Sequence, residues 1–183
     1  MKCLRARIAI VCSLSALQLA SCGWFGGKMG ENAGARAEVE GFMPNTVRGT
    51  VYFTQDLEKG LRITGEISGL LPDQSYAMHI AQNGNCGNPK APGDDFDPGK
   101  SGKHGATGLS PGQAHAGDLP NIKAGGNGKA KIDITTNALG IGKSDYSVLE
   151  RSVVIYANPD DFSTQPQGNV GEAIACGVIQ STR

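Results

Sequence analysis

Three side chains of the types that bind metal ions lie in the stretch SGKHGATGLSPGQAHAGDLP (101–120), namely His104, His115 and Asp118. Imidazole nitrogens and carboxylate oxygens are common zinc ligands, and a long loop can wrap to present them around one ion. The surrounding glycines, prolines and other small residues have no hydrophobic periodicity, so the stretch has no apolar face on which to fold. Something other than an apolar core must therefore hold this loop in shape, and a metal ion is one candidate.

The loop lies between segments whose polarity alternates. In LRITGEISGL (61–70), Leu61, Ile63 and Ile67 fall on one face and polar side chains fall on the other. This period of two is typical of an antiparallel strand with one face in solvent. By the same pattern, strands are expected at 35–42, 48–55, 61–70, 75–81, 128–136, 151–157 and 172–180.

Between residues 82 and 123 the alternation is absent. A loop of this length inside a compact domain is usually functional, or it is held by a metal ion or a disulfide. The chain has 183 residues, 27 of them glycine, and few aromatic residues, which fits one all-β domain with many tight turns. We predict an antiparallel sandwich or flattened barrel at 36–183.

The N-terminus has the features of an export signal. The basic stretch MKCLRAR precedes an apolar run at 8–20, which is shorter than a membrane-spanning helix needs. The run ends in LASC, which resembles the lipobox of bacterial lipoproteins, where the cysteine is lipidated. We predict a signal peptide at 1–21, a membrane anchor on lipidated Cys22, a Gly-rich tether at 22–35, and a place in the cell envelope, facing the periplasm or the exterior. A plain secretory signal is the alternative.

Removal of this signal would leave few cysteines. Cys3 and Cys12 would be lost, and Cys22 would carry lipid. Cys86 and Cys176 would remain, and in an oxidising environment they have one possible intramolecular pairing. Such a bridge would close a loop of about 90 residues and stabilise the fold by about 4–5 kcal/mol on the loop-entropy account. Two buried free thiols are the alternative.

A series of short motifs runs through the chain in a fixed order: CGNP, DFDP, KSGKHG, HAGDLPNI, VVIYANPDD and IACGVI. This series resembles the copper/zinc superoxide dismutase family over residues 36–181. The resemblance implies a Greek-key antiparallel β-sandwich of about eight strands with two long loops. By position, His104, His115 and Asp118 match three of the family's four zinc ligands, and Cys86 and Cys176 match its disulfide.

The copper-binding residues of the family are largely missing at the matching positions. The histidine-X-histidine pair falls on His79 and Ala81, and the bridging histidine falls on Asp95. The fourth copper histidine falls on Tyr156, and the arginine that guides superoxide falls on Ala173. The family's paired site takes six histidines and an aspartate, whereas this chain has 3 histidines in all. Copper is therefore not expected to bind, and no catalytic residue is predicted.

Zinc differs from copper because a carboxylate can replace the bridging imidazole. Asp95, His104, His115 and Asp118 would supply four protein ligands and leave no open position, which is typical of a structural zinc site. Asp160 matches the family's aspartate that orients histidines on both sides of the paired site, and we expect it to accept a hydrogen bond from the free ring nitrogen of His104. A solvated loop carboxylate is the alternative for Asp160.

His79 has two interpretations. It can be a relic that hydrogen-bonds to a neighbour such as Asp160, or a remnant site that takes Cu(I) with a methionine from elsewhere. Tyr156 is expected to pack into the vacated copper position. No other sequence feature favours the Cu(I) interpretation.

These observations predict a superoxide dismutase-like envelope lipoprotein that holds zinc and does not dismute superoxide. An active superoxide dismutase with a non-standard metal site is the first alternative. The second is a hydrolytic zinc site with an open position, for which Asp94, Asp97 and Glu172 are the candidate bases. No nucleic-acid partner is expected, because 17 basic and 17 acidic residues cancel and create no global field. The sequence identifies no protein partner.

Overall fold

The computed structural model describes residues 34–106 and 113–182, and within them it contains β-strands and no helix. The strands are β1 (Gly34–Gly41), β2 (Arg48–Asp56), β3 (Gly60–Ser68), β4 (Ser75–Tyr76), β5 (Met78–Ala81), β6 (Ile122–Lys123), β7 (Ala130–Thr136), β8 (Ser152–Tyr156) and β9 (Ala173–Ser181). The all-β prediction is confirmed, and the outer bounds of each predicted strand are met to within two residues.

Two details differ from the predicted strands. The segment 75–81 divides at Ala77, because Ser75 and Tyr76 pair with β6 whereas the following residues pair with β8. The strand β6 lies in the stretch where the alternation is absent. A strand of two residues is too short to show a period, so the sequence pattern had no means to reveal it.

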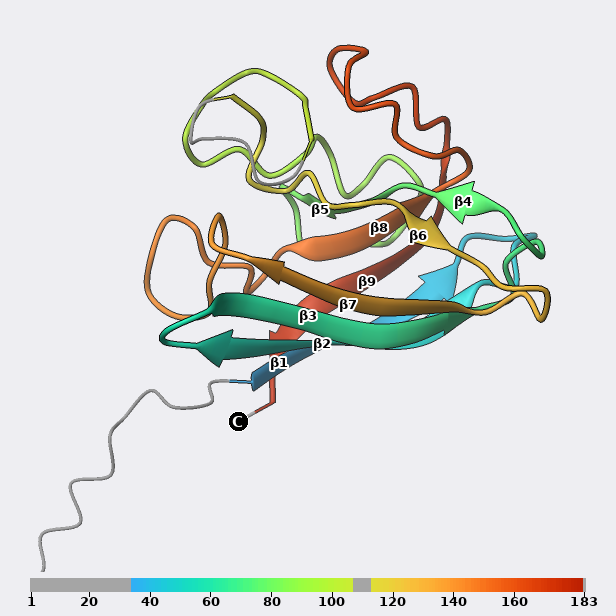
Figure 1. Cartoon of the computed structure of the whole chain (residues 1–183), viewed down its shortest axis with the longest axis horizontal. Helices are drawn as coiled ribbons and strands as arrows, with labels where there is room; N and C mark the ends of the chain where they lie inside the picture. Colours follow the sequence, from blue (N-terminus) through green and yellow to red (C-terminus); the bar gives the residue numbers. More distant parts are fainter. Residues whose placement is uncertain (1–33, 107–112, 183) are drawn as a thin grey trace, which may run out of the picture.

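Seven of the strands form one sheet in the order β5-β8-β9-β1-β2-β3-β7, and every neighbouring pair is antiparallel. The chain runs from β1 to β3 through hairpins, and the later strands return to both edges, as in a Greek key. Figure 1 shows the sheet curling, with β3 and β7 in front of β8 and β9. The long connections are 82–121, 137–151 and 157–172, one more than expected. The described parts of the first, 82–106 and 113–121, and the third connection lie above β5 and β8 (Figure 1).

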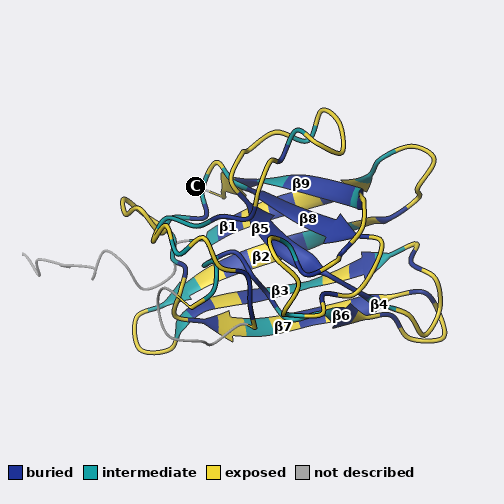
Figure 2. Ribbon diagram, turned by 90° about the horizontal axis from the view of Figure 1, so that it is seen from above, coloured by how far each residue is buried: buried dark blue, intermediate teal, exposed yellow. Residues whose placement is uncertain are grey.

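The main core lies inside the curled sheet. In β1, Ala35, Ala37 and Val39 point inward, while the residues between them are exposed. The same alternation marks β2, β3 and β7, where buried and exposed residues alternate along the ribbons in Figure 2. Removing these aliphatic side chains from water is the main contribution to stability.

Strands β5 and β8 are buried on both faces. Met78 and Ile80 belong to the main core, so the alternation places His79 on the opposite face of β5. The long connections cover that face, and a second small cluster lies beneath them: Ala77, Ala81, Val154, Tyr156, Val170, Ala173 and Cys176. The sheet therefore has a second interior, which is where the candidate site lies.

A disulfide joins Cys86, in the connection 82–121, to Cys176 in β9, with 5.6 Å between the two Cα atoms. The predicted pairing is confirmed. It ties the start of the ligand-bearing connection to the middle of the sheet, across a sequence separation of 90 residues.

The predicted signal peptide, Cys22 and most of the predicted tether lie outside the described residues. Strand β1 begins at Gly34, two residues before the predicted domain boundary. Within the residues described, no helix is long and apolar enough to cross a membrane.

Candidate metal centre

The backbone of Ile80 in β5 holds the two loop segments that carry the candidate aspartates. Ile80 donates its N–H to the carbonyl of Gly117 (2.9 Å) and accepts from the N–H of Phe96 (2.8 Å), and Gly117 donates to Phe96 (2.9 Å). Asp95 and Asp118 each adjoin one of these residues, so both are held against β5. Position 117 requires glycine, because the Cβ atom of any other residue would overlap the carbonyl oxygen of Ile80.

The four residues predicted as zinc ligands converge, and one donor atom from each lies within 4.8 Å of the others. The Nδ1 atoms of His104 and His115 lie 3.1 Å and 3.3 Å from Oδ1 of Asp118. Both also lie 3.7 Å from Oδ2 of Asp95. A tetrahedron with zinc–ligand distances of about 2.0–2.1 Å has edges of about 3.3–3.4 Å. The spacing of the donors therefore fits a tetrahedral zinc ion.

The carboxylates of Asp118 and Asp95 both face the two histidines, but their hydrogen bonding differs. Oδ2 of Asp118 accepts hydrogen bonds from the backbone N–H groups of Gly105 (3.0 Å) and His115 (3.1 Å), which directs Oδ1 toward the histidines. Oδ2 of Asp95 is buried and has no hydrogen-bond partner. Buried polar atoms are rarely left unpaired, and an ion bound beside them is one common explanation. A cation between the four donors would satisfy this oxygen.

A second carboxylate network adjoins this group. Oδ1 of Asp160 lies 2.8 Å from Nε2 of His104, the contact expected from the sequence, and Oδ2 lies 2.9 Å from Nε2 of His79. The other ring nitrogen of His79, Nδ1, lies 3.0 Å from Oδ1 of Asp95. Asp160 is buried and not a solvated loop carboxylate. His79, His104 and Asp160 also form a group that could hold a metal, but their separations are those of direct hydrogen bonds.

Three residues that the sequence did not single out hold Asp160 and His104. The side chain of Asn121 accepts from the N–H of Asp160 and donates to its carbonyl. The side chain of Gln165 pairs in the same way with the backbone of His104, at 2.8 Å in both directions. Gly168 has φ of 72°, and a Cβ atom there would overlap Oδ1 of Asp160. Of the three, only Asn121 lay within a recognised motif, HAGDLPNI.

The network shifts the pKa values of its histidines upward. Burial alone would lower the pKa of His79 and His104, but the facing carboxylates outweigh it and raise both to about 9. Asp118 and Asp95 raise the pKa of His115 to about 10. Burial would raise the pKa of Asp95, yet the three histidines hold it well below its usual range. Without a metal, the centre is therefore a set of ion pairs, and a metal must displace protons to bind.

The residues predicted to stand at the family's copper positions offer little to a metal ion: both ring nitrogens of His79 are engaged, and the side chains of Ala81 and Tyr156 are apolar or protonated. Ala81 is fully buried and offers no donor. Tyr156 is buried with its ring centroid 5.3 Å from that of His79. Burial raises the pKa of the Tyr156 phenol further above its ordinary value, which keeps it protonated and disfavours metal binding. Ala173 lies in the same apolar cluster.

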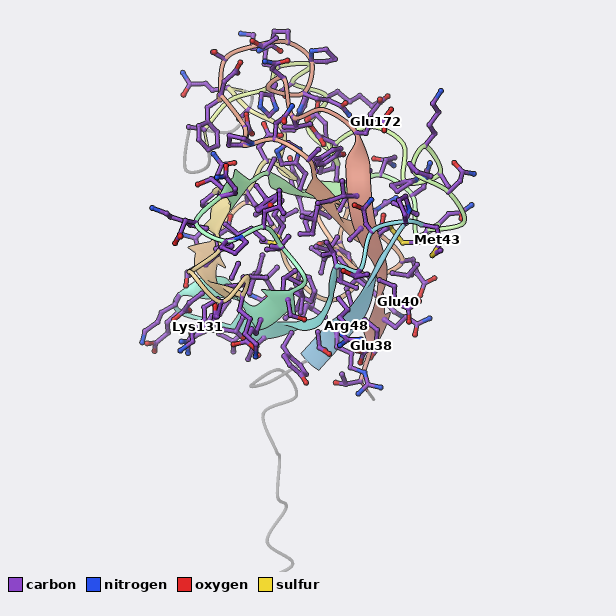
Figure 3. The ribbon with its side chains drawn as sticks, turned by 90° about the vertical axis from the view of Figure 1, so that its right-hand side faces the viewer. Glu38, Glu40, Met43, Arg48, Lys131 and Glu172 are labelled. Atoms are coloured by element: carbon purple, nitrogen blue, oxygen red, sulfur yellow. A yellow bond between two sulfur atoms is a disulfide. The ribbon has the colours of Figure 1, made fainter. Side chains whose placement is uncertain are left out.

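Within residues 34–106 and 113–182, no side-chain position favours the hydrolytic zinc site or the Cu(I) site, and Met29 lies outside these residues. Asp94 and Glu172 are exposed, and Glu172, labelled in Figure 3, immediately precedes β9. Asp97 accepts hydrogen bonds from Ser101 and Gly102 of its own loop. For the Cu(I) interpretation, Met78 lies in the main core on the other face of β5 from His79. Met43 is 91% exposed (Figure 3).

The family model and the curated relatives identify one family. Residues 47–179 match the family described as copper/zinc superoxide dismutase. A copper–zinc superoxide dismutase of Deinococcus radiodurans is 38% identical over 146 residues, covering 74% of this chain and 78% of that protein. Another, from Arabidopsis thaliana, is 37% identical over 142 residues, covering 74% of this chain and 84% of that protein. The crystal structure of the clock protein EA4 is similar with a TM-score of 0.72 and 28% identity, covering 82% of this chain and 95% of that one.

Proposed function

Because the chain belongs to the copper/zinc superoxide dismutase family, we propose that it is a member that keeps a structural zinc ion and does not carry out copper-dependent dismutation. One observation carries this proposal. Oδ2 of Asp95 is buried without a hydrogen-bond partner and faces the Nδ1 atoms of His104 and His115. Asp95 stands at the position of the family's bridging histidine, so it replaces that imidazole as a zinc ligand.

The proposed ion has a structural task. Asp95, His104, His115 and Asp118 supply four protein ligands, which leaves no position for a reacting water. When bound, zinc supplies charge and cross-linking rather than redox chemistry. It would join the two parts of the connection 82–121 that Ile80 holds against β5. The protein's activity would then be a binding or scaffolding role performed by the fold.

The loss of copper chemistry is supported by the donors around His79. Copper that cycles between two oxidation states needs several imidazoles to hold it. Here both ring nitrogens of His79 face carboxylates, at 3.0 Å and 2.9 Å. Ala81 and Tyr156 add no imidazole, and the whole sequence contains 3 histidines. These residues do not fit a copper ion.

The opposing candidate is an active superoxide dismutase with a non-standard metal site, which the names of the relatives favour. The test is elemental analysis of the mature protein purified without added metal, followed by measurement of superoxide loss after incubation with copper. We expect one zinc per chain, no copper, and no superoxide loss above that of free copper and a zinc-only sample. Stoichiometric copper, or catalysis above both controls, would reject the proposal.

We also propose that the domain is anchored in the cell envelope by a lipid on Cys22, with residues 23–33 leading to β1. The support is the LASC sequence after the apolar run. Metabolic labelling with a fatty-acid analogue tests this. The full-length chain should incorporate label and fractionate with membranes, and a Cys22→Ala variant should do neither. Equal labelling of both chains, or none of either, would contradict lipidation at this residue.

A further inference from the structure

His79 is fully buried on the covered face of β5, and both of its ring nitrogens are engaged. Nδ1 lies 3.0 Å from Oδ1 of Asp95, and Nε2 lies 2.9 Å from Oδ2 of Asp160. The position matches a copper ligand of the family, yet no ring nitrogen is left for a metal. The imidazole ring is rigid, and each of its two nitrogens contacts a different carboxylate. His79 therefore fixes the position of each carboxylate relative to the other.

We propose that His79 is a positioning residue for zinc: its Nδ1 fixes Oδ1 of Asp95 so that Oδ2 points at the ion. The inference rests on the proposed zinc site. Within the described part of the chain, His79 is the one hydrogen-bond partner of the Asp95 carboxylate. Without it, that carboxylate would be free to rotate about its Cβ–Cγ bond. The Asp118 carboxylate needs no such partner, because two backbone N–H groups already hold it.

The second contact links His79 to another zinc ligand. Asp160 holds His79 with one oxygen and Nε2 of His104 with the other, at 2.9 Å and 2.8 Å. The side chain of Asn121 and the N–H of Phe162 fix Asp160 in turn. His79 therefore acts on the metal along two routes, directly through Asp95 and indirectly through Asp160. Groups of this kind around a metal site typically change its affinity by about 10–100-fold when removed.

Two substitutions separate these routes. The amide nitrogen of asparagine is three bonds from Cα, as is Nδ1 of histidine, so His79→Asn retains a donor toward Asp95. The amide nitrogen of glutamine is four bonds from Cα, as is Nε2, so His79→Gln retains the donor toward Asp160 instead. If the direct route through Asp95 is the stronger one, His79→Gln should bind zinc more weakly than His79→Asn.

The experiment measures zinc affinity by competition with a chromophoric chelator for the wild-type chain and both variants. We expect His79→Gln to lose about 10–100-fold in affinity, and His79→Asn to lose several-fold less. Cobalt substitution supplies a second readout. Wild-type and His79→Asn should show the intense visible absorption of tetrahedral cobalt, whereas His79→Gln should show a weaker spectrum as a solvent ligand replaces Asp95.

Two controls distinguish a change in zinc affinity from a general loss of stability. Met78→Leu changes the adjacent buried residue on the opposite face of β5 and should leave zinc affinity unchanged. Unfolding of every variant in excess chelator measures the loss of stability that does not involve metal. Equal loss of affinity in His79→Asn and His79→Gln, or no loss in His79→Gln, would overturn the inference. A wild-type chain that binds no zinc would instead overturn the proposed function.

Discussion

The two halves of the buried polar cluster use the same residue types at different separations. In the zinc half, the Nδ1 atoms of His104 and His115 stand 3.1–3.7 Å from their facing carboxylate oxygens. In the other half, the contacts of His79 and Asp160 measure 2.8–3.0 Å. The first set lies near the edges of a coordination tetrahedron, although its contacts with Asp118 at 3.1 Å and 3.3 Å are also hydrogen bonds. The second set consists of hydrogen bonds alone, so the 3.7 Å separations from Asp95 are what set the candidate metal site apart.

Asp95 belongs to both halves, and its two carboxylate oxygens differ in their hydrogen-bond partners. Oδ1 pairs with His79, while Oδ2 has no hydrogen-bond partner and faces the zinc half. An imidazole at this position would bridge two metals, whereas this carboxylate joins one candidate metal to a histidine. The comparison predicts that substitutions in the zinc half change metal content, and that substitutions at Tyr156 do not.

The largest effect is expected from Asp118→Ala. The variant loses one proposed ligand and the acceptor for the N–H groups of Gly105 and His115. Zinc at a thousand times its dissociation constant adds about 4 kcal/mol to the free energy of unfolding of the wild type, and we expect the variant to lose most of that increment. Denaturant unfolding with zinc and with chelator measures it. Asp94→Ala, at an exposed position, is the control, and an unchanged zinc increment in Asp118→Ala would contradict the assignment.

A smaller effect is expected from Gly168→Ala. Gly168 and Gly102 both have positive φ, of 72° and 60°, so alanine at either position is strained by about 1–2 kcal/mol. Only at Gly168 would the new Cβ atom overlap Asp160, since nothing lies within 4 Å of the Cβ position at Gly102. We expect about 1–3 kcal/mol of further destabilisation from this overlap, together with weaker zinc binding. Equal unfolding free energies for the two variants would show that Asp160 is not tightly enclosed.

The next prediction concerns pH. The pKa values of His104 and His115 are raised from 6.5 to about 9 and about 10, so both side chains carry a proton at pH 7 in the metal-free fold. Their contribution to metal-free stability is fully present below about pH 6.5 and is lost as pH rises through 9 to 10. Zinc affinity has the opposite dependence, because both Nδ1 atoms must deprotonate to bind.

Binding at pH 7 should therefore release about two protons per zinc. Calorimetry in buffers of different ionisation enthalpy measures this number. Release of no protons would place the zinc ion elsewhere than between these histidines.

The smallest effect is expected from Tyr156→Phe. The ring packs against His79 in the apolar cluster under the loops, and the phenylalanine ring fills the same space. We expect the free energy of unfolding to change by less than about 1 kcal/mol, with zinc affinity unchanged. A tenfold fall in zinc affinity would make the Tyr156 hydroxyl part of the metal centre.

The strands were predictable because most of them have one face in the core and one in solvent. Apolar and polar residues therefore alternate along the sequence. The residues of the candidate metal centre were predictable because the motifs keep His104, His115 and Asp118 in a recognisable order. Gln165 and Gly168 were not, because they reach the site through backbone pairing and close approach. Of the two contacts of His79, the one with Asp160 was among the sequence expectations and is confirmed. The one with Asp95 was not, because it depends on the side-chain direction of a residue 16 positions away along the chain.

The three buried aspartates of this cluster have an electrostatic consequence for ion selectivity. Asp95, Asp118 and Asp160 place three anionic groups in the interior. A divalent ion cancels two of them, and the imidazolium of His79, which has a carboxylate on each side, cancels the third. Electroneutrality is then reached with a single metal. With the proposed zinc ion bound, a second cation would meet no remaining anion and would have to shed its hydration shell without compensation, so we expect charge as well as the shortage of ligands to exclude it.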